Sequence, residues 1–368
     1  MEHRNKSATA QVTGNTTSVA EKLTPAAKIN LLIFNCILLS VGNCGGPLIM
    51  RLYFLHGGHR IWLIGFIQTV GWPLIFIILV LLYFQRRVAG INNGNNHPTT
   101  FIYMRRRLFM AVALIGVLTG LDDYLYSYGV AHLPISTYAL INASRLVFMA
   151  FFAFILVKQK FTPYSINAVV LLTVGSALLA FHASGDRPEG ERTAEYIMGF
   201  LMTVAAAALY GLVSPLVELT YKKAKQEITY TLVLEVQTVM CLFATVFCML
   251  GMIFNNDFKV ISKEAEDFGL GKMNYYVILS VSIILWQCFF LGAIGVIHYG
   301  SSLLLGVIAT VQIPVMEILA VIFYKEKFGS EKGVALVLSL WGFLSFLYGE
   351  YKHMKKIENN SQSTSEVV

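Results

Sequence analysis

The chain has 368 residues, of which 56% are hydrophobic and only 13% carry a charge, and its mean hydropathy is +0.63. A soluble domain carries about 25% charged residues. The composition therefore excludes a disordered chain, a collagen, a disulfide scaffold and almost any soluble enzyme. What remains is a polytopic membrane protein, whose formal net charge of +7 reflects basic cytoplasmic loops rather than binding to nucleic acid.

Residues 1–28 are polar and lack the apolar core of a signal peptide, which predicts a tail that stays in the cytoplasm. A helix that crosses a bilayer needs about 20 apolar residues. Ten segments meet that requirement; charge, Gly or Pro bounds each of them, and a second polar tail follows at 352–368. The segments are 29–54, 60–84, 107–130, 134–157, 162–183, 195–220, 229–254, 274–299, 301–324 and 332–351.

Basic residues set the predicted orientation. Lys and Arg concentrate in the N-terminal tail, in the 85–107 loop and after residue 351, and cytoplasmic loops carry such an excess. An even number of spans then places both termini in the cytoplasm.

An internal repeat is the most informative pattern. The sequence KQKF at 158–161 returns as KEKF at 325–328, and each copy closes one span and is followed by one more. We therefore expect two five-helix halves, 29–183 and 195–351, joined by a loop at 184–194. An odd number of spans in each half inverts the second half, which is a common architecture of secondary transporters with a site near the bilayer midplane.

Ionisable residues inside spans are costly in lipid and are therefore candidates for function. Asp122 and Asp123 lie in the third span and Arg145 in the fourth, at depths within about 6 Å of each other by helix rise. One interpretation is a structural ion pair between Asp122 and Arg145. The other is that a carboxylate, Asp123, takes up a proton as substrate binds.

Glu317 is the second candidate for proton coupling. It lies deep in the ninth span, one turn after Pro314, which frees a backbone carbonyl.

Aromatic and amide side chains within the spans suggest a flat heterocyclic ligand, which needs rings to stack on and amides to read its nitrogens. Two competing interpretations are that the aromatic residues lie at the lipid headgroups and that the amides form hydrogen bonds between helices. The predicted substrate-binding residues are Asn43, Gln68, Trp72, Tyr126, Asn142, Trp286, Gln287, Phe290 and Gln312.

Several chemistries have no signature in the sequence. There is no GxxxxGK[ST] motif for ATP, no metal-ligand spacing among the five cysteines and no catalytic triad, so we expect no metal, no cofactor and no enzyme. The deep part of the spans holds a single Arg and no Lys, which favours a neutral or cationic substrate over phosphates and nucleotide sugars.

Eight short stretches together resemble the plant purine permease family, within the drug/metabolite transporter superfamily. They are GNCGGPL (42–48), RLYF (51–54), QTVGWP (68–73), LTGLDD (118–123), KQKFTP (158–163), HASGDRP (182–188), Trp286-Gln287 and KEKF (325–328). The resemblance covers roughly 29–351. It implies ten helices in two repeats and proton-coupled uptake of purines such as adenine, of cytokinins or of related heterocycles, usually at the plasma membrane.

One departure concerns the fourth span, where the family pattern has an uncharged residue at Arg145 and a small one near Asn142. The two changes share one helix face and could favour another substrate, such as a plant alkaloid. The resulting hypothesis is an all-α transporter that imports a small nitrogen heterocycle with protons. The alternatives are alkaloid uptake, export of amino acids or drugs on the same fold, a membrane-embedded enzyme and a channel.

Overall fold

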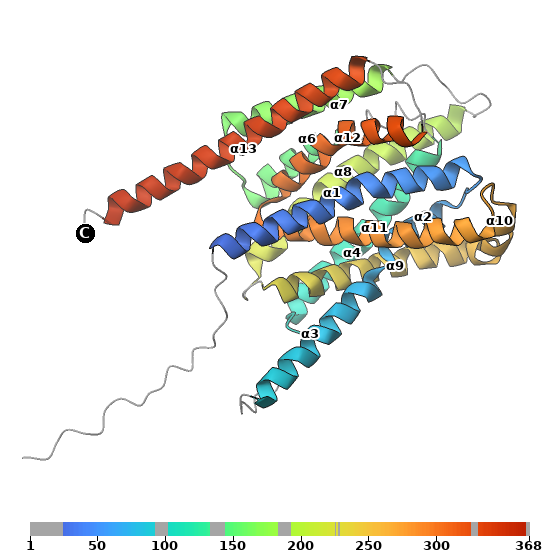
Figure 1. Cartoon of the computed structure of the whole chain (residues 1–368), viewed down its shortest axis with the longest axis horizontal. Helices are drawn as coiled ribbons and strands as arrows, with labels where there is room; N and C mark the ends of the chain where they lie inside the picture. Colours follow the sequence, from blue (N-terminus) through green and yellow to red (C-terminus); the bar gives the residue numbers. More distant parts are fainter. Residues whose placement is uncertain are drawn as a thin grey trace, which may run out of the picture.

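A computed structural model of the chain describes residues 25–92, 102–132, 144–182, 193–224, 226, 229–324 and 330–365. All regular structure in these residues is helical. The longer helices run roughly along one direction and form a bundle with α4, α8, α9 and α11 at its centre (Figure 1). The bounds are α1 Pro25–Leu55, α2 Ile61–Thr69, α3 Trp72–Asn92, α4 Arg106–His132, α6 Arg145–Phe152, η1 Ala153–Val157, α7 Pro163–His182, α8 Thr193–Lys223, α9 Tyr230–Phe254, η2 Asp257–Lys259, α10 Ile261–Asp267, α11 Lys272–Tyr299, α12 Ser302–Tyr324 and α13 Ser330–Ser365.

Seven stretches within the described residues are long and apolar enough to cross a membrane. They are Ala26–Leu55, Ile61–Val88, Arg106–Gly129, Ile197–Lys223, Tyr230–Phe254, Lys272–Tyr299 and Gly333–Lys352. Three shorter apolar helices, Arg145–Val157, Pro163–Gly175 and Ser302–Met316, fall in the other predicted spans. The described helices therefore confirm an all-α membrane protein, while the count of ten spans stays a prediction.

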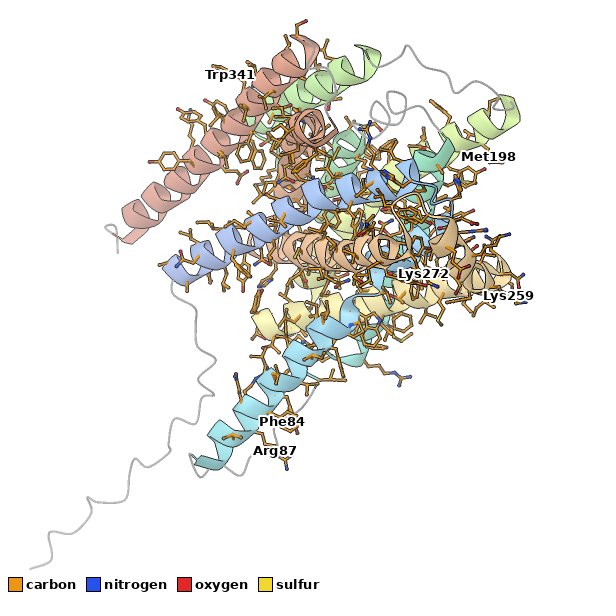
Figure 2. The ribbon with its side chains drawn as sticks, turned by 45° about the vertical axis from the view of Figure 1, so that its right-hand side comes forward. Phe84, Arg87, Met198, Lys259, Lys272 and Trp341 are labelled. Carbon is orange, nitrogen blue, oxygen red and sulfur yellow. The ribbon has the colours of Figure 1, made fainter. Side chains whose placement is uncertain are left out.

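Apolar side chains cover the outside of the bundle. Phe84 on α3 and Trp341 on α13 point away from it and are 52% and 65% exposed (Figure 2). Such exposure in water would be costly, but in a bilayer these side chains meet lipid. α1 begins and α13 ends at the same end of the bundle, and α10 lies at the opposite end (Figure 1).

The second predicted span is bent rather than straight. Pro73 has no backbone N–H, so the carbonyl of Thr69, four residues earlier, loses its helical donor and α2 ends there. The side-chain amide of Gln287 donates to that carbonyl over 3.3 Å from α11. The break changes the direction in which Trp72 and the residues after it face.

The last helix is longer than the sequence predicts. α13 continues to Ser365, so most of the tail expected at 352–368 is helical. α13 packs along α7 in a reciprocal way: a Cβ on Gly175 would lie 3.3 Å from the carbonyl oxygen of Ala335, and a Cβ on Gly342 would lie 3.3 Å from that of Ala168.

Glycines let α1 and α11 pack backbone to backbone. A Cβ on Gly42 would lie 2.3 Å from the backbone nitrogen of Phe289, and a Cβ on Gly292 would lie 2.3 Å from that of Leu39. Real Cβ contacts are longer, and backbone atoms cannot move aside as a flexible side chain can. Close approach of the two helices therefore requires glycine at both positions.

We expect Gly292→Ala to destabilise the protein by about 1–3 kcal/mol, the usual cost of overpacking. The measurement is the midpoint of thermal unfolding in detergent together with the monodisperse yield. Gly65→Ala is the matched control, because a Cβ there would meet its nearest atom, the sulfur of Cys248, at an ordinary 3.4 Å. Equal stability of the two variants would contradict the close packing.

Candidate functional site

A cavity of about 410 Å³ lies inside the bundle, between helices of both halves of the chain. Side chains of α1, α2, α4, α6, α8, α9, α11 and α12 line it. Its volume falls in the range of small-molecule sites, roughly 300–1,000 Å³. The described part of the chain thus contains a cavity whose size suits a small ligand.

The acidic side of the cavity comes from α4. Asp122 and Asp123 both line it and are only 7% and 5% exposed. One oxygen of each carboxylate, Oδ1 of Asp122 and Oδ2 of Asp123, is buried with no hydrogen-bond partner among the described residues. Because a buried acceptor without a partner is costly, these oxygens are suited to bind a proton or a donor of a ligand.

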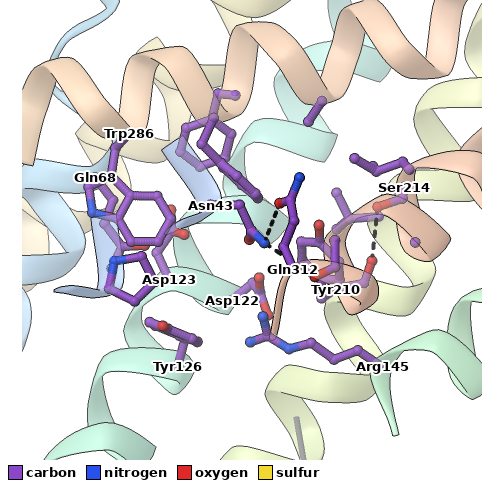
Figure 3. A pocket seen from close by; sticks show the side chains of 18 of the residues that line it. Asn43, Gln68, Asp122, Asp123, Tyr126, Arg145, Tyr210, Ser214, Trp286 and Gln312 are labelled. Carbon is purple, nitrogen blue, oxygen red and sulfur yellow. Dashed lines mark hydrogen bonds between the residues drawn. The ribbon is translucent and has the colours of Figure 1, made fainter. Parts of the chain in front are cut away.

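Arg145 lies at the start of α6 with its guanidinium directed toward Asp122 (Figure 3). The guanidinium carbon lies 4.9 Å from the centroid of the Tyr126 ring and 4.8 Å from that of the Tyr210 ring. The positive charge of Arg145 interacts with both Asp122 and Asp123. The proximity of Asp122, Asp123 and Arg145 agrees with the depths calculated from the sequence.

Amides line another part of the cavity. Asn43 on α1 donates its side-chain N–H groups to Oε1 of Gln312 over 2.9 Å and to the carbonyl oxygen of Ala309 over 3.2 Å, both on α12 (Figure 3). Gln312 donates in turn to the hydroxyl of Ser40. These bonds connect a helix of the first half to a helix of the second half at the wall of the cavity.

Aromatic rings form a wall beside the acidic side. Trp286, Phe289 and Phe290 of α11 line the cavity, and Trp286 meets Tyr126 edge to face with centroids 6.3 Å apart. Gln68 on α2 also lines the cavity and donates to the hydroxyl of Ser127 over 3.1 Å. Rings next to polar groups are what a flat heterocycle requires.

Two of the predicted binding residues lie elsewhere. Trp72 is not among the cavity-lining residues; it begins α3 and packs edge to face against Phe76. Gln287 also lies outside the lining. Its side chain donates a hydrogen bond to the carbonyl oxygen of Thr69 and accepts one from Gln237 at Oε1 over 3.4 Å. Gln287 therefore serves to join helices rather than to face the cavity.

Two further predicted residues cannot be placed. Asn142 lies outside the described residues, and so does the side chain of Glu317, although its backbone belongs to α12. The remaining predicted residues all line the cavity: Asn43, Gln68, Asp122, Asp123, Tyr126, Arg145, Trp286, Phe290 and Gln312.

Tyr210, Phe289 and Ser214 line the cavity without having been predicted. Tyr210 and Ser214 stand four residues apart on α8, and Ser214 donates to the carbonyl oxygen of Tyr210 over 3.3 Å. That spacing placed both on one face, but nothing in the sequence indicates that Arg145 meets that face.

Other buried carboxylates cap helices. Glu218 accepts the backbone N–H and the hydroxyl of Ser302 over 2.7 and 2.6 Å at the start of α12. Glu235 accepts the backbone N–H groups of Tyr103 and Met104 just before α4. Their oxygens satisfy helix ends, so these residues are weaker candidates for proton coupling than the carboxylates in the cavity.

A polar cluster ties four elements together at the end of the bundle that carries α10. Nε of Arg60 lies 3.3 Å from Oε2 of Glu264 and Nη1 of Arg60 lies 3.5 Å from Oδ1 of Asp257. The hydroxyls of Tyr53 and Tyr275 both donate to Oε1 of Glu264. Burial raises the pKa of Asp257, and the charge of Arg60 offsets part of that rise.

The described residues contain no group of three or more His, Cys, Asp or Glu side chains that could hold a metal ion. The cavity lining combines two carboxylates and two guanidinium groups, those of Arg51 and Arg145, with amides, aromatic rings and aliphatic side chains.

Comparisons with known proteins bear on the family of the chain. A family model described as purine nucleobase transmembrane transport matches residues 30–356. From Arabidopsis thaliana, purine permease 3 is 54% identical over 322 residues, which cover 88% of this chain and 91% of that protein. Purine permease 2 is 49% identical, with coverage of 92% and 97%, and purine permease 21 is 32% identical, with coverage of 96% and 88%.

A solved structure titled "Crystal structure of protein" matches the fold with a TM-score of 0.59. It is 15% identical in sequence, and the match covers 86% of this chain and 97% of the other. At that identity the likeness concerns the fold alone.

Proposed function

The chain belongs to the purine permease family of membrane transporters, and from that premise we propose that it imports adenine, cytokinins or related purines together with protons. It is a multi-pass membrane transporter and not an enzyme. The proposal concerns the coupling ion, the direction of transport and the members of the substrate class.

The cavity is the observation that carries the proposal. It brings two nearly buried carboxylates together with rings and amides inside the membrane-spanning bundle. In our proposal Trp286 and Phe290 stack on the purine, and Asn43, Gln68 and Gln312 bind its nitrogens. Carboxylates within membrane spans commonly carry protons in transporters. We assign that role to Asp123, which is buried in the cavity wall, and to Glu317, which the sequence places deep in the ninth predicted span.

We assign Asp122 to a structural pair with Arg145. The guanidinium is directed toward Asp122 in Figure 3, and the two charges attract. Asp123 then remains the carboxylate that can gain and lose a proton without leaving Arg145 uncompensated.

Alternating access by two inverted five-helix repeats, 29–183 and 195–351, is the mechanism we propose. The reciprocal packing of α7 and α13 supports it. The alignment of KQKF with KEKF also pairs Ala168 with Ala335 and Gly175 with Gly342. The glycine of α7 faces the alanine carbonyl of α13, and the glycine of α13 faces the equivalent carbonyl of α7. A two-fold relation between the repeats produces such a pair of equivalent contacts.

α1 begins and α13 ends at the same end of the bundle, which is the arrangement that an even number of spans gives (Figure 1). We place that end in the cytoplasm, from the distribution of Lys and Arg, and we place the protein in the plasma membrane.

Uptake by yeast that lacks its own purine transport tests the function. We expect accumulation of radiolabelled adenine that rises as the external pH falls and that a protonophore abolishes, with competition by a cytokinin. Caffeine and a cationic alkaloid complete the panel. If the alkaloid alone is accumulated, the assignment to purines is wrong; if a protonophore has no effect, the proton coupling is wrong.

A further inference from the structure

We propose that Tyr210 and Tyr126 are positioning residues that hold the guanidinium of Arg145 in place. Held there, the cation lies beside Asp122 and Asp123 and determines how readily the carboxylates take up a proton and how tightly the cavity binds substrate. The inference rests on the function proposed above.

The first argument is the contact itself. The guanidinium carbon of Arg145 lies at almost the same distance, 4.9 and 4.8 Å, from the ring centroids of Tyr126 and Tyr210. Both distances are within the roughly 6 Å over which a cation is attracted to a ring face, and the attraction strengthens away from water. A planar guanidinium stacks on aromatic rings in a way that an ammonium cannot. Arg145 therefore connects α6 to α4 through one ring and to α8 through the other.

The second argument is the packing of α6 on α8 next to Tyr210. A Cβ on Gly211 would lie 2.6 Å from Cβ of Phe148 and 2.8 Å from the backbone nitrogen of Met149. The first turn of α6 thus lies directly on the backbone of α8. Since Arg145 is in that turn, the close approach brings its side chain over the ring that precedes Gly211.

The third argument comes from the other half of the chain. The alignment that pairs Lys158 with Lys325 also pairs Arg145 with Gln312. Gln312 accepts a hydrogen bond from Asn43 and so joins α12 to α1. Both positions thus join one helix to another at the cavity wall. Gln312 does so by a side-chain hydrogen bond, and Arg145 does so by cation–π contacts.

The charges around the two carboxylates determine what a displaced Arg145 would do. A nearby cation favours the ionised form of a carboxylate, so a cation free to move away lets protonation occur at a higher pH. Among the described residues, the charged or titratable groups that line the cavity or interact with the carboxylates are Arg51 on α1, Tyr126 on α4, Arg145 on α6, Tyr210 on α8, and Cys241 and Cys248 on α9. Of these cations, Arg145 is the one that attracts both carboxylates.

The test compares Tyr210→Leu with Tyr210→Phe in the full-length protein, by the pH profile of adenine uptake and by adenine affinity. Leu removes the ring while keeping an apolar side chain, and Phe keeps the ring face. We expect Leu to move the midpoint of the pH profile upward by about one unit, and to weaken adenine affinity several-fold. We expect Phe, which keeps the ring face, to recover most of what Leu loses in both measurements.

A double-mutant cycle with Arg145→Gln tests whether Tyr210 acts by positioning Arg145 or only by supporting the structure. If Tyr210 acts through Arg145, the double variant Tyr210→Leu/Arg145→Gln matches Arg145→Gln alone in affinity. Equal effects of Leu and Phe, or a Leu effect that persists in full without Arg145, would overturn the inference. The affinity cycle needs no proton gradient, so it decides the inference even if wild-type uptake proves independent of pH, a result that would overturn the proton coupling instead.

Discussion

Purified Asp123→Asn in liposomes is expected to equilibrate adenine across the membrane without concentrating it. One coupled proton supplies about 1.4 kcal/mol for each unit of pH gradient, which concentrates a neutral substrate about tenfold. Asn keeps the size of the side chain but cannot ionise, so the cavity loses the group that we propose to load and release the proton. Counterflow exchange of labelled for unlabelled adenine needs no proton movement and should persist.

Asp122→Asn is the matched control, because it removes the neighbouring carboxylate on the same helix. In our assignment it weakens the attraction that positions Arg145 and lowers activity, yet the remaining transport still concentrates adenine in a pH gradient. Glu317→Gln is expected to weaken gradient-driven uptake as Asp123→Asn does. If Asp123→Asn and Glu317→Gln both still concentrated adenine as the wild type does, neither residue would carry the coupled proton and our assignment would be wrong.

Seven of the predicted segments coincide with described helices that are long and apolar enough to cross a membrane, because long apolar runs bounded by charge or Pro leave few choices for where a helix crosses lipid. The sequence also brought Asp123 and Arg145 to similar depths, since helix rise is constant along a span. Both results depend on distances along the chain, which the sequence contains directly.

The errors concern direction around the helix axis. The prediction that Gln68 and Trp72 both bind substrate treated the span 60–84 as one continuous helix, and the break before Pro73 changes the direction in which Trp72 points. Trp286 and Gln287 are adjacent, and adjacent residues in a helix point about 100° apart, so one faces the cavity and the other a neighbouring helix. Tyr210 was missed because its partner, Arg145, lies on another helix far away in the sequence.

Trp286→Ala should weaken adenine affinity about tenfold or more, because stacking of a base on an aromatic side chain is worth about 1–3 kcal/mol. Trp286 lines the cavity and also supports its aromatic wall through Phe289 and Phe290, with ring centroids 5.4 and 6.4 Å away. Trp286→Phe should recover most of the affinity, because a smaller ring still offers a face to the purine.

Trp72→Ala is the control for the loss of a large ring as such. It truncates the same type of residue in the same bundle, but at a position outside the cavity lining, and we expect the affinity for adenine to stay within about twofold of the wild type. Competition by unlabelled adenine against labelled adenine, measured for the three variants at equal surface expression, compares the two positions directly. If Trp72→Ala weakened binding as much as Trp286→Ala, the ring that stacks on the purine would not be the one that faces the cavity, and the central cavity would lose its role as the binding site.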